Sequence, residues 1–329
     1  MISDFVEPDE WATYMESMRK VDPGDSRSTP FGTMFGHVVE PTSLEDMGQY
    51  DVVLVGEPYD RGHILGKPGA RYGPATIREG LANTKTHHLD NGNVDLSIAD
   101  LGDVRIPKGK NNQTQHAKLR EVANTLHERD VFSIFLGGDH SVTYPNAAPL
   151  IEQYDSVGIV NFDSHDDLLE PINGEPHSAS NFRQLYEEGL EVYTIVGARP
   201  FGVGQPSFDY LTEHGGMAIS SENVGDDPIG AVNTALDSMS SVDAIFVTLD
   251  IDVIEMALVP GTSAPYPGGL LPRELFRAVR TLLLDDRVKG LDLVEVADVL
   301  DDSRNTTSMT AGRVIAHAIS GINQREENE

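Results

Sequence analysis

Short apolar runs alternate with segments of helical periodicity along most of this chain, beginning near Tyr50. The apolar runs cover residues 51–55, 96–101, 131–136, 156–162, 191–196, 216–219, 243–249 and 291–296. Between many of them apolar positions recur with a helical period, for example over 115–129, 228–239, 272–284 and 309–319. Strands that alternate with helices predict βαβ units and a mostly parallel sheet.

Several of these runs have no polar face, as a sheet covered by helices on both sides requires. The pattern therefore predicts an α/β fold, a three-layer α/β/α sandwich around a mostly parallel eight-stranded sheet. Residues 1–48 are polar and are predicted to form an N-terminal arm with a short helix near 10–18. Because no linker or repeat interrupts the rest, we expect a single domain over 49–323 and an acidic tail at 324–329.

Composition narrows the chemistry that this fold can carry. The 329 residues include no cysteine, which excludes disulfide scaffolds, thiolate metal sites and cysteine nucleophiles. A formal net charge of −29 disfavours nucleic acid as a partner. It is typical of a protein from a salt-loving cell, where salt screens surface repulsion, although an ordinary acidic cytosolic protein is the alternative. The N-terminus does not resemble a signal peptide and no apolar stretch suits a membrane span, so we expect a cytoplasmic protein.

Three predicted strands end in acidic and imidazole side chains. Ligands of open parallel sheets bind beyond the carboxyl ends of the strands. The run 131–136 is followed by Gly-Gly-Asp-His-Ser, the run 156–162 by Asp-Ser-His-Asp-Asp, and the run 243–249 by Asp-Ile-Asp. The candidate ligands are His140, Asp163, His165, Asp167, Asp250 and Asp252. If the chain stays extended there, residues i and i+2 point the same way and can share a target.

Four aspartates and two histidines in one cavity imply bound cations. The carboxylates would repel one another, and some would have to protonate. Two divalent metals would offset the negative charge, and an oxygen-rich site with some imidazole suits Mn²⁺ better than Zn²⁺ or Cu²⁺. Such a pair can turn water into a nucleophile near neutral pH. Each single aspartate could instead be a cap or a turn residue, so only the three groups together indicate a metal site.

The same segments resemble the ureohydrolase (arginase/agmatinase) family from about Asp51 to about Ile319. The resemblance lies in GGDHS, DSHDD, LDIDVIEMALVPGTSAPYPGGL and the earlier GEPYDRGHILGKPGARYGPATIR. It implies an arginase-like fold, a catalytic domain over 49–323 and two Mn²⁺ ions per subunit. The implied ligands are His140, Asp163, Asp167 and Asp250 for one ion, and Asp163, His165, Asp250 and Asp252 for the other. A water shared by both metals would attack the substrate carbon, and Glu295 would hold the cationic amidine nitrogens.

One segment departs from the better-known members of this family, in which a proton-shuttling histidine precedes a glycine. This chain has GEPHSASNFRQL there. Alignment on Phe182 and Arg183 puts Ser178 in the place of the shuttle and His177 one position before it. A serine at that place is typical of the formimidoylglutamase branch, which GGDHSVTYPN and VGARPF also resemble, although the Gly-Thr-Pro element of that branch is missing.

The substrate offers an independent clue, because formimino-glutamate carries two carboxylates and agmatine carries a distal amine. Arg183 and Arg199 follow the fourth and fifth predicted strands on the active edge. With Ser178, they are candidates to bind an acidic substrate. Both arginines could equally be structural ion-pair partners.

The expected activity is therefore hydrolysis of N-formimino-L-glutamate to L-glutamate and formamide, a reaction of histidine degradation. Asp167, Glu295 and His177 are the expected catalytic residues. The alternatives are an agmatinase or another guanidino-acid hydrolase that releases urea, and a non-catalytic binding protein on the same scaffold. The resemblance also implies a homo-oligomer, either a trimer or a hexamer.

Overall fold

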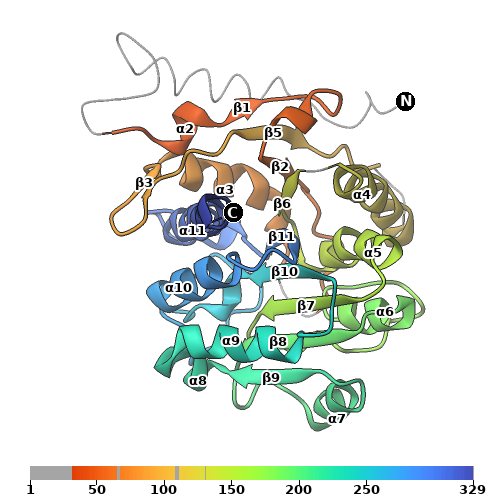
Figure 1. The fold of residues 1–329 in the computed structure, drawn as a ribbon. Coiled ribbons are helices and arrows are strands. Elements are labelled where there is room, and N and C mark those ends of the chain that lie inside the picture. Colours follow the sequence, from red (N-terminus) through yellow and green to blue (C-terminus); the bar gives the residue numbers. More distant parts are fainter. Residues whose placement is uncertain (1–31, 65–66, 108–110, 130, 329) are drawn as a thin grey trace.

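The computed structural model describes residues 32–64, 67–107, 111–129 and 131–328. Its centre is a parallel sheet in the order β1-β5-β2-β6-β11-β10-β7-β8-β9 (Figure 1). The strands are β1 (Glu40–Pro41), β2 (Val52–Gly56), β5 (Ile98–Asp103), β6 (Phe132–Leu136), β7 (Val157–Phe162), β8 (Val192–Ala198), β9 (Met217–Ser220), β10 (Ala244–Asp250) and β11 (Val288–Val294). A short antiparallel hairpin, β3 (His87–His88) and β4 (Gly92–Asn93), stands apart from it. The predicted α/β fold with a parallel central sheet is confirmed.

The predicted count of eight strands is wrong, because the described part of the chain places nine strands in the central sheet. The additional strand is β1, which pairs in parallel with Ala99 and Asp100 of β5 inside the segment expected to be an arm. Its two residues, Glu40 and Pro41, have no apolar pattern, and proline is tolerated at the edge of a sheet. The helix expected near 10–18 lies outside the described residues.

Helices cover both faces of the sheet, as a three-layer architecture requires (Figure 1). One face carries α3 (Gly73–Ala82), α8 (Ser221–Asp226), α9 (Pro228–Ser238), α10 (Pro272–Leu282) and α11 (Thr306–Asn328). The other face carries α4 (Asn112–His127), α5 (Thr143–Gln153), α6 (Asn181–Glu188) and α7 (Gln205–Glu213). The short α2 (Phe35–Val38) precedes β1. Among the described residues, no helix combines the length and the apolar character that a membrane crossing needs.

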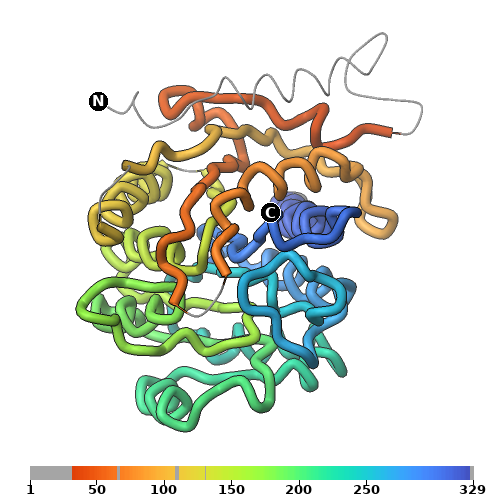
Figure 2. The backbone as a smooth tube through the Cα atoms, turned by 180° about the vertical axis from the view of Figure 1, so that it is seen from behind, coloured from red at the N-terminus to blue at the C-terminus, as the bar shows by residue number. Residues whose placement is uncertain are grey.

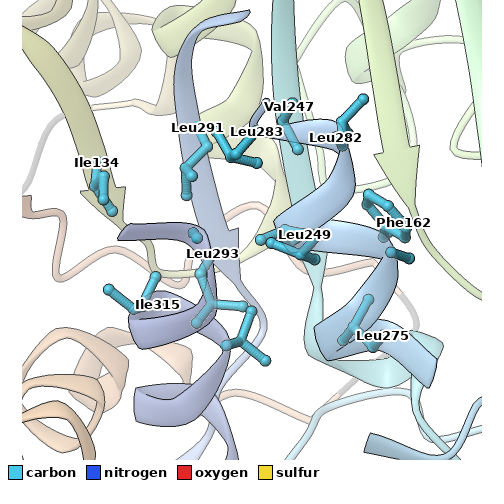
Figure 3. Packing of buried hydrophobic residues seen from close by; sticks show 14 of the residues in the cluster. Ile134, Phe162, Val247, Leu249, Leu275, Leu282, Leu283, Leu291, Leu293 and Ile315 are labelled. Atoms are coloured by element: carbon cyan, nitrogen blue, oxygen red, sulfur yellow. The ribbon is translucent and has the colours of Figure 1, made fainter. Parts of the chain in front are cut away.

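The core beneath α10 and α11 consists mainly of aliphatic side chains from both layers. Figure 3 shows Leu249 and Leu293 of the sheet facing Leu275 and Ile315 of the helices, and all four are buried. Burying one such side chain stabilises the fold by about 1.5–3 kcal/mol. Helix α11 also lies beside α3, far away in sequence (Figure 2). A Cβ on Gly312 would lie 2.1 Å from the Gly80 carbonyl carbon, so this close contact between helices requires glycine.

The register of the central strands brings their carboxyl ends level with one another. Leu249 of β10 pairs with Phe162 of β7, and Asp250 pairs with Val294 of β11. Leu136 of β6 pairs with Leu293 of β11. The loops that follow β6, β7, β10 and β11 therefore begin side by side at one edge of the sheet.

The free energy of unfolding is expected to fall as the pH drops from about 6.5 towards 4, partly because of His127. Its imidazole contacts Phe135 and Phe246, and its Nε2 lies 2.9 Å from the Asn146 carbonyl oxygen. Burial lowers the pKa of His127 to about 4. Since an unfolded histidine has a pKa of about 6.5, the unfolded chain binds the extra proton, at a cost of at most about 3 kcal/mol.

The variant His127→Gln keeps an N–H donor but does not titrate in this range. Chemical unfolding at constant high salt between pH 4 and 7 should therefore show a shallower pH dependence than for the wild type. Identical slopes for the two proteins would show that His127 is not responsible.

Candidate metal centre

The loop after β6 places His140 at the carboxyl edge of the sheet. The chain passes so close to the preceding loop that a Cβ on Gly138 would lie 1.7 Å from the Tyr59 carbonyl oxygen. Asp139 then accepts a hydrogen bond from the Ser141 amide at 3.0 Å, which starts a short 3-10 helix at His140. Glycine is therefore needed where the loop turns, and the capped turn fixes the backbone of His140.

The loops after β7 and β10 turn immediately instead of remaining extended. Asp163 accepts a hydrogen bond from the His165 amide at 2.7 Å, and Asp250 accepts one from the Asp252 amide at 2.8 Å. Asp167 has a positive φ of 47°, an uncommon conformation that often marks functional sites when it occurs outside glycine. The assumption of an extended chain was wrong, since these turns, and not strand alternation, aim the side chains.

The six predicted ligands nevertheless come together around two imidazole nitrogens. The Nδ1 atom of His140 lies 3.2 Å from Asp163 Oδ2 and 2.9 Å from Asp167 Oδ2. Asp250 Oδ2 is 3.4 Å from the same nitrogen. The Nδ1 atom of His165 lies 3.4 Å from Asp163 Oδ1 and 3.1 Å from Asp252 Oδ2. Asp163 thus presents one carboxylate oxygen to each histidine, as a bridging ligand would.

Two overlapping groups of these residues have the spacing that a metal ion needs. They are His140, Asp163 and Asp250, and Asp163, His165 and Asp252, with the ligand atoms of each group within 4.8 Å of one another. Asp167 belongs to neither group, although it approaches His140. Asp163 is the member shared by both.

The electrostatics of this cluster fit cations better than protons. Burial, with repulsion from Asp163, raises the pKa of Asp167 to about 7, and burial beside Asp252 raises the pKa of Asp250 strongly. Against the effect of burial, contacts with Asp163, Asp167 and Asp250 raise the pKa of His140 well above its usual value. Yet His140 Nδ1 is buried and has no well-formed hydrogen bond among the described residues. A divalent cation between this nitrogen and the carboxylates would satisfy all of them.

A buried polar chain beneath the site orients the ring of His140. Its Nε2 lies 3.1 Å from the hydroxyl oxygen of Thr248, which is 3.2 Å from the hydroxyl oxygen of Thr143. Thr143 in turn donates a hydrogen bond to Asp292 at 2.8 Å. Because Nε2 is directed at a hydroxyl group, Nδ1 faces the carboxylates of the cluster. This arrangement is typical of metal-bound histidine.

Glu295 lies beside this cluster, at the end of β11. Its Oε1 accepts a hydrogen bond from the His140 amide at 2.8 Å, and its Oε2 accepts one from the Ser263 hydroxyl. Glu295 has a positive φ of 63°, which is uncommon for a residue other than glycine. The carboxylate is thus held rigidly at the carboxyl edge of the sheet, where the resemblance placed it.

His177 and Ser178 lie in the loop before α6, but the ring of His177 faces its own loop. Its Nε2 is 3.0 Å from the Glu170 carbonyl oxygen, and its Nδ1 accepts a hydrogen bond from the Ala179 amide at 3.2 Å. The amide of Ser178 donates to the Gly62 carbonyl oxygen at 2.8 Å. Both ring nitrogens of His177 therefore have local backbone partners, which favours a structural role over the predicted catalytic one.

The two arginines proposed for substrate binding differ in their surroundings. Arg199 is 1% exposed, and its guanidinium donates to the carbonyl oxygens of Gly197 and Asp252 at 2.9 and 2.8 Å. These contacts favour the structural alternative for Arg199. The guanidinium of Arg183 stacks on the Tyr210 ring at 4.0 Å, and its Nε donates to the Leu168 carbonyl oxygen at 3.2 Å. Arg183 therefore lies next to the loop that carries Asp167.

The sequence interpretation missed several polar residues that complete the site. Asn161 donates a hydrogen bond to Asp163 at 3.0 Å, and Thr248 contacts His140. Both are polar residues inside otherwise apolar strands, two positions before an aspartate ligand, and that pattern was a usable signal. Ser263 and His63 come from distant loops. Both lie in segments that carry the family resemblance, but neither stands at the end of an apolar run.

Comparison with known proteins finds relatives over most of the chain. Residues 50–321 match the sequence model of the arginase family. The chain is 44% identical over 295 residues to a formimidoylglutamase of Halobacterium salinarum, covering 89% of this chain and 95% of that protein. It is 32% identical over 286 residues to an agmatinase of Bacillus subtilis. That alignment covers 85% of this chain and 94% of the agmatinase. The crystal structure of the formimidoylglutamase of Bacillus subtilis superimposes on this structure with a TM-score of 0.83 at 25% sequence identity. The superposition covers 94% of this chain and 98% of that one.

Proposed function

Because the chain belongs to the arginase family, we propose that it is a metal-dependent hydrolase of N-formimino-L-glutamate. Its products would be L-glutamate and formamide. The observation that carries the proposal is the shared carboxylate of Asp163 between two imidazole-carboxylate groups at the sheet edge. The choice of substrate is supported by the 44% identity to a formimidoylglutamase, against 32% to an agmatinase.

The residues that would hold the metals are the six that converge there. His140, Asp163, Asp167 and Asp250 would hold one Mn²⁺, and Asp163, His165, Asp250 and Asp252 the other. An oxygen-rich set with one imidazole per ion suits Mn²⁺. When bound, two such cations supply the positive potential that makes a water acidic enough to attack an amidine near neutral pH.

The protein itself would bind and orient the substrate. The Glu295 carboxylate, fixed by the His140 amide and the Ser263 hydroxyl, offers its remaining lone pairs to the amidinium nitrogens. Such a charge-assisted contact would hold the amidine carbon beside the carboxylate cluster. Holding the reactants together in this way removes much of the entropic barrier of the reaction.

Arg183 is the candidate that we retain for a substrate carboxylate. Its present ionic partner is Glu170, whose Oε1 lies 3.2 Å from the Nη1 atom of Arg183. The side chain of Glu170 is 81% exposed. Exposed ion pairs of this kind contribute only about 0–1 kcal/mol, so a substrate carboxylate could displace Glu170.

We expect Arg183→Gln to raise KM for N-formimino-L-glutamate about tenfold or more and to change kcat little, because a charge-assisted hydrogen bond contributes about 1.5–3 kcal/mol. Steady-state kinetics at constant salt measure both constants. The matched control is Glu170→Gln, which removes the competing partner and should not raise KM. An unchanged KM in Arg183→Gln would rule out this contact.

A substrate panel in molar salt with Mn²⁺ tests the proposed function. N-formimino-L-glutamate, agmatine and guanidino acids are supplied separately, and formamide and urea are scored by NMR. Formamide from the formimino substrate is the expected result. Urea from a guanidino substrate would instead establish the second candidate, a guanidino-acid hydrolase, which the 32% identity to an agmatinase favours.

A further inference from the structure

We propose that Arg199 is a positioning residue for the ion proposed beside His165, and that it does not serve the ion proposed beside His140. This inference rests on the proposed function, because it starts from the dinuclear centre, but it concerns metal binding and not the substrate. Arg199 follows β8, and the sequence interpretation treated it as a candidate for substrate binding. Its hydrogen bonds point instead to the loops of one ion.

The backbone of Arg199 is joined to the loop that contains two of the proposed ligands. Its amide donates a hydrogen bond to the Ser164 carbonyl oxygen at 3.1 Å, and Ser164 lies between Asp163 and His165. The Arg199 carbonyl oxygen accepts from the Gly202 amide at 2.8 Å, which closes a tight turn after the strand. The loop after β8 is therefore tied to the loop after β7 at the residue between two ligands.

The guanidinium of Arg199 reaches the loop that contains a third proposed ligand, Asp252. Its Nη2 donates to the Asp252 carbonyl oxygen at 2.8 Å and lies 3.3 Å from the Ile254 carbonyl oxygen. Its Nη1 donates to the Gly197 carbonyl oxygen at 2.9 Å, so the side chain folds back along its own strand. A single buried residue thus connects the loops after β7, β8 and β10.

A further loop passes over the guanidinium and reaches the ring of His165. The Nη2 atom of Arg199 lies 3.3 Å from the Tyr266 carbonyl oxygen. The Tyr266 ring stands nearly perpendicular to the His165 ring, at 82°, with the ring centroids 6.1 Å apart. A Cβ on Gly269 would lie 2.3 Å from Nη2, so the loop can pass this close only with glycine. Arg199 therefore also fixes the residue that packs on the imidazole.

The charge of Arg199 is balanced by the metal centre. Among the described residues, the hydrogen bonds of its guanidinium go to carbonyl oxygens and not to a carboxylate. Burial lowers the pKa of Arg199, and the nearby charges of Asp252 and Asp163 oppose that effect. A buried charge is costly unless opposite charges compensate it. The guanidinium and these two carboxylates therefore stabilise one another, which offsets part of the repulsion between the aspartates.

The ion proposed beside His140 has a separate support, the buried hydroxyl chain beneath its ring. In the described part of the chain, the hydrogen bonds of Arg199 go to the loops after β7, β8 and β10 and to the loop at Tyr266, and none goes to the loop after β6. Asp252 and His165 are the ligands proposed for the other ion alone, and they are the ones that Arg199 holds. Loss of Arg199 should thus disturb one ion more than the other.

The test loads the full chain with Mn²⁺ in high salt and dialyses it against graded Mn²⁺ concentrations. We expect Arg199→Lys and Arg199→Gln to raise the Kd of one ion about 10–100-fold and to change the Kd of the other less than about threefold. The electron paramagnetic resonance spectrum of a coupled manganese pair should give way to that of a single ion. Anomalous scattering from Arg199→Lys crystals should keep the peak beside His140 and lose the peak beside His165.

Arg78→Lys is the matched control. Arg78 is also buried, but its guanidinium donates to the Asp100 carboxylate, at 2.8 and 2.9 Å, and not to a loop of the metal centre. This variant should keep both ions even where its Tm falls, so it separates a general loss of stability from a selective loss of metal. If Arg199→Gln does not fold, Arg199→Lys carries the test, because lysine keeps the buried charge but lacks the planar fork that reaches several carbonyl oxygens.

Three results would overturn the proposal: unchanged Kd values for both ions, equal weakening of both ions, or weakening confined to the ion beside His140. Tighter binding beside His165 would also overturn it, because the charge of Arg199 would then outweigh its hydrogen bonds. A wild type that binds fewer than two ions would contradict the dinuclear centre, and this inference with it. A wild type that binds two ions but releases no formamide would contradict only the proposed substrate.

Discussion

Replacing Asp163 with asparagine is expected to lower kcat for formamide release by about 10³-fold or more, equivalent to about 4 kcal/mol of transition-state stabilisation. Each oxygen of Asp163 faces a different histidine, so the change removes negative charge from both proposed ion sites at once. Asparagine preserves the shape of the side chain and can still accept the His165 amide hydrogen bond. The manganese content, measured by elemental analysis after dialysis, should fall below that of the wild type.

The adjacent residue Asp166 provides the matched control. It is also buried, but its Oδ1 accepts a hydrogen bond from the Leu168 amide at 3.1 Å and belongs to neither metal group. Asp166→Asn should therefore leave kcat and manganese content close to wild-type values. Full activity in Asp163→Asn, measured beside this control, would refute a centre in which Asp163 bridges two ions.

Glu295→Gln is expected to lower kcat/KM about 10²–10³-fold, which corresponds to about 2.7–4 kcal/mol. The charge of Glu295 is the proposed partner of the amidinium, and glutamine cannot replace that charge. The fold should survive, because the glutamine oxygen can accept from the His140 amide while its NH₂ group faces Ser263. Thermal unfolding of the variant separates a loss of binding from a loss of structure.

Ser263→Ala is the comparison for this variant, because it removes the hydroxyl group that holds Glu295 but leaves the carboxylate charge. We expect a loss of about tenfold, in line with one hydrogen bond to a charged group. Equal losses in the two variants would mean that orientation, and not charge, explains the contribution of Glu295. Wild-type kinetics in Glu295→Gln would remove the residue from the substrate site.

Most of the fold could be predicted from the sequence because its strands are buried on both faces. Such strands, among them β7 and β10, appear as uninterrupted apolar runs whatever surrounds them. The edge strand β1 has no such run, since Glu40 and Pro41 contribute backbone hydrogen bonds and little apolar surface. An edge strand of this kind depends on tertiary contact and has no local signature.

The sequence could predict only those site residues that lie at the carboxyl ends of strands. Asp163 and Asp250 come at the ends of apolar runs, and His140 follows another run after three residues, so the parallel sheet brings all three to one edge. One contact of Arg199 depends on the Asp252 carbonyl oxygen, 53 residues away, and the contact of His63 depends on a carboxylate that follows β11, so neither has a local signal. The predicted salt-loving origin, cytoplasmic location and trimeric or hexameric state stay predictions.

The charge of −29 divides into two parts with different meanings. A few carboxylates, among them Asp163, Asp250 and Glu295, are buried together at one edge of the sheet. Burial, together with the proximity of Asp252 and Asp163, raises the pKa of Asp250, so this cluster needs compensation by cations or protons. Exposed acids such as Glu170 face solvent, where salt can screen them.

Anomalous X-ray scattering from crystals soaked with Mn²⁺ tests the central claim most directly. We expect two manganese peaks per chain, one beside His140 Nδ1 and one beside His165 Nδ1, with the Asp163 carboxylate between them. The distances from each peak to its ligands identify the ligand set without any assumption about activity. A single peak, or two peaks that do not share Asp163, would contradict the dinuclear centre.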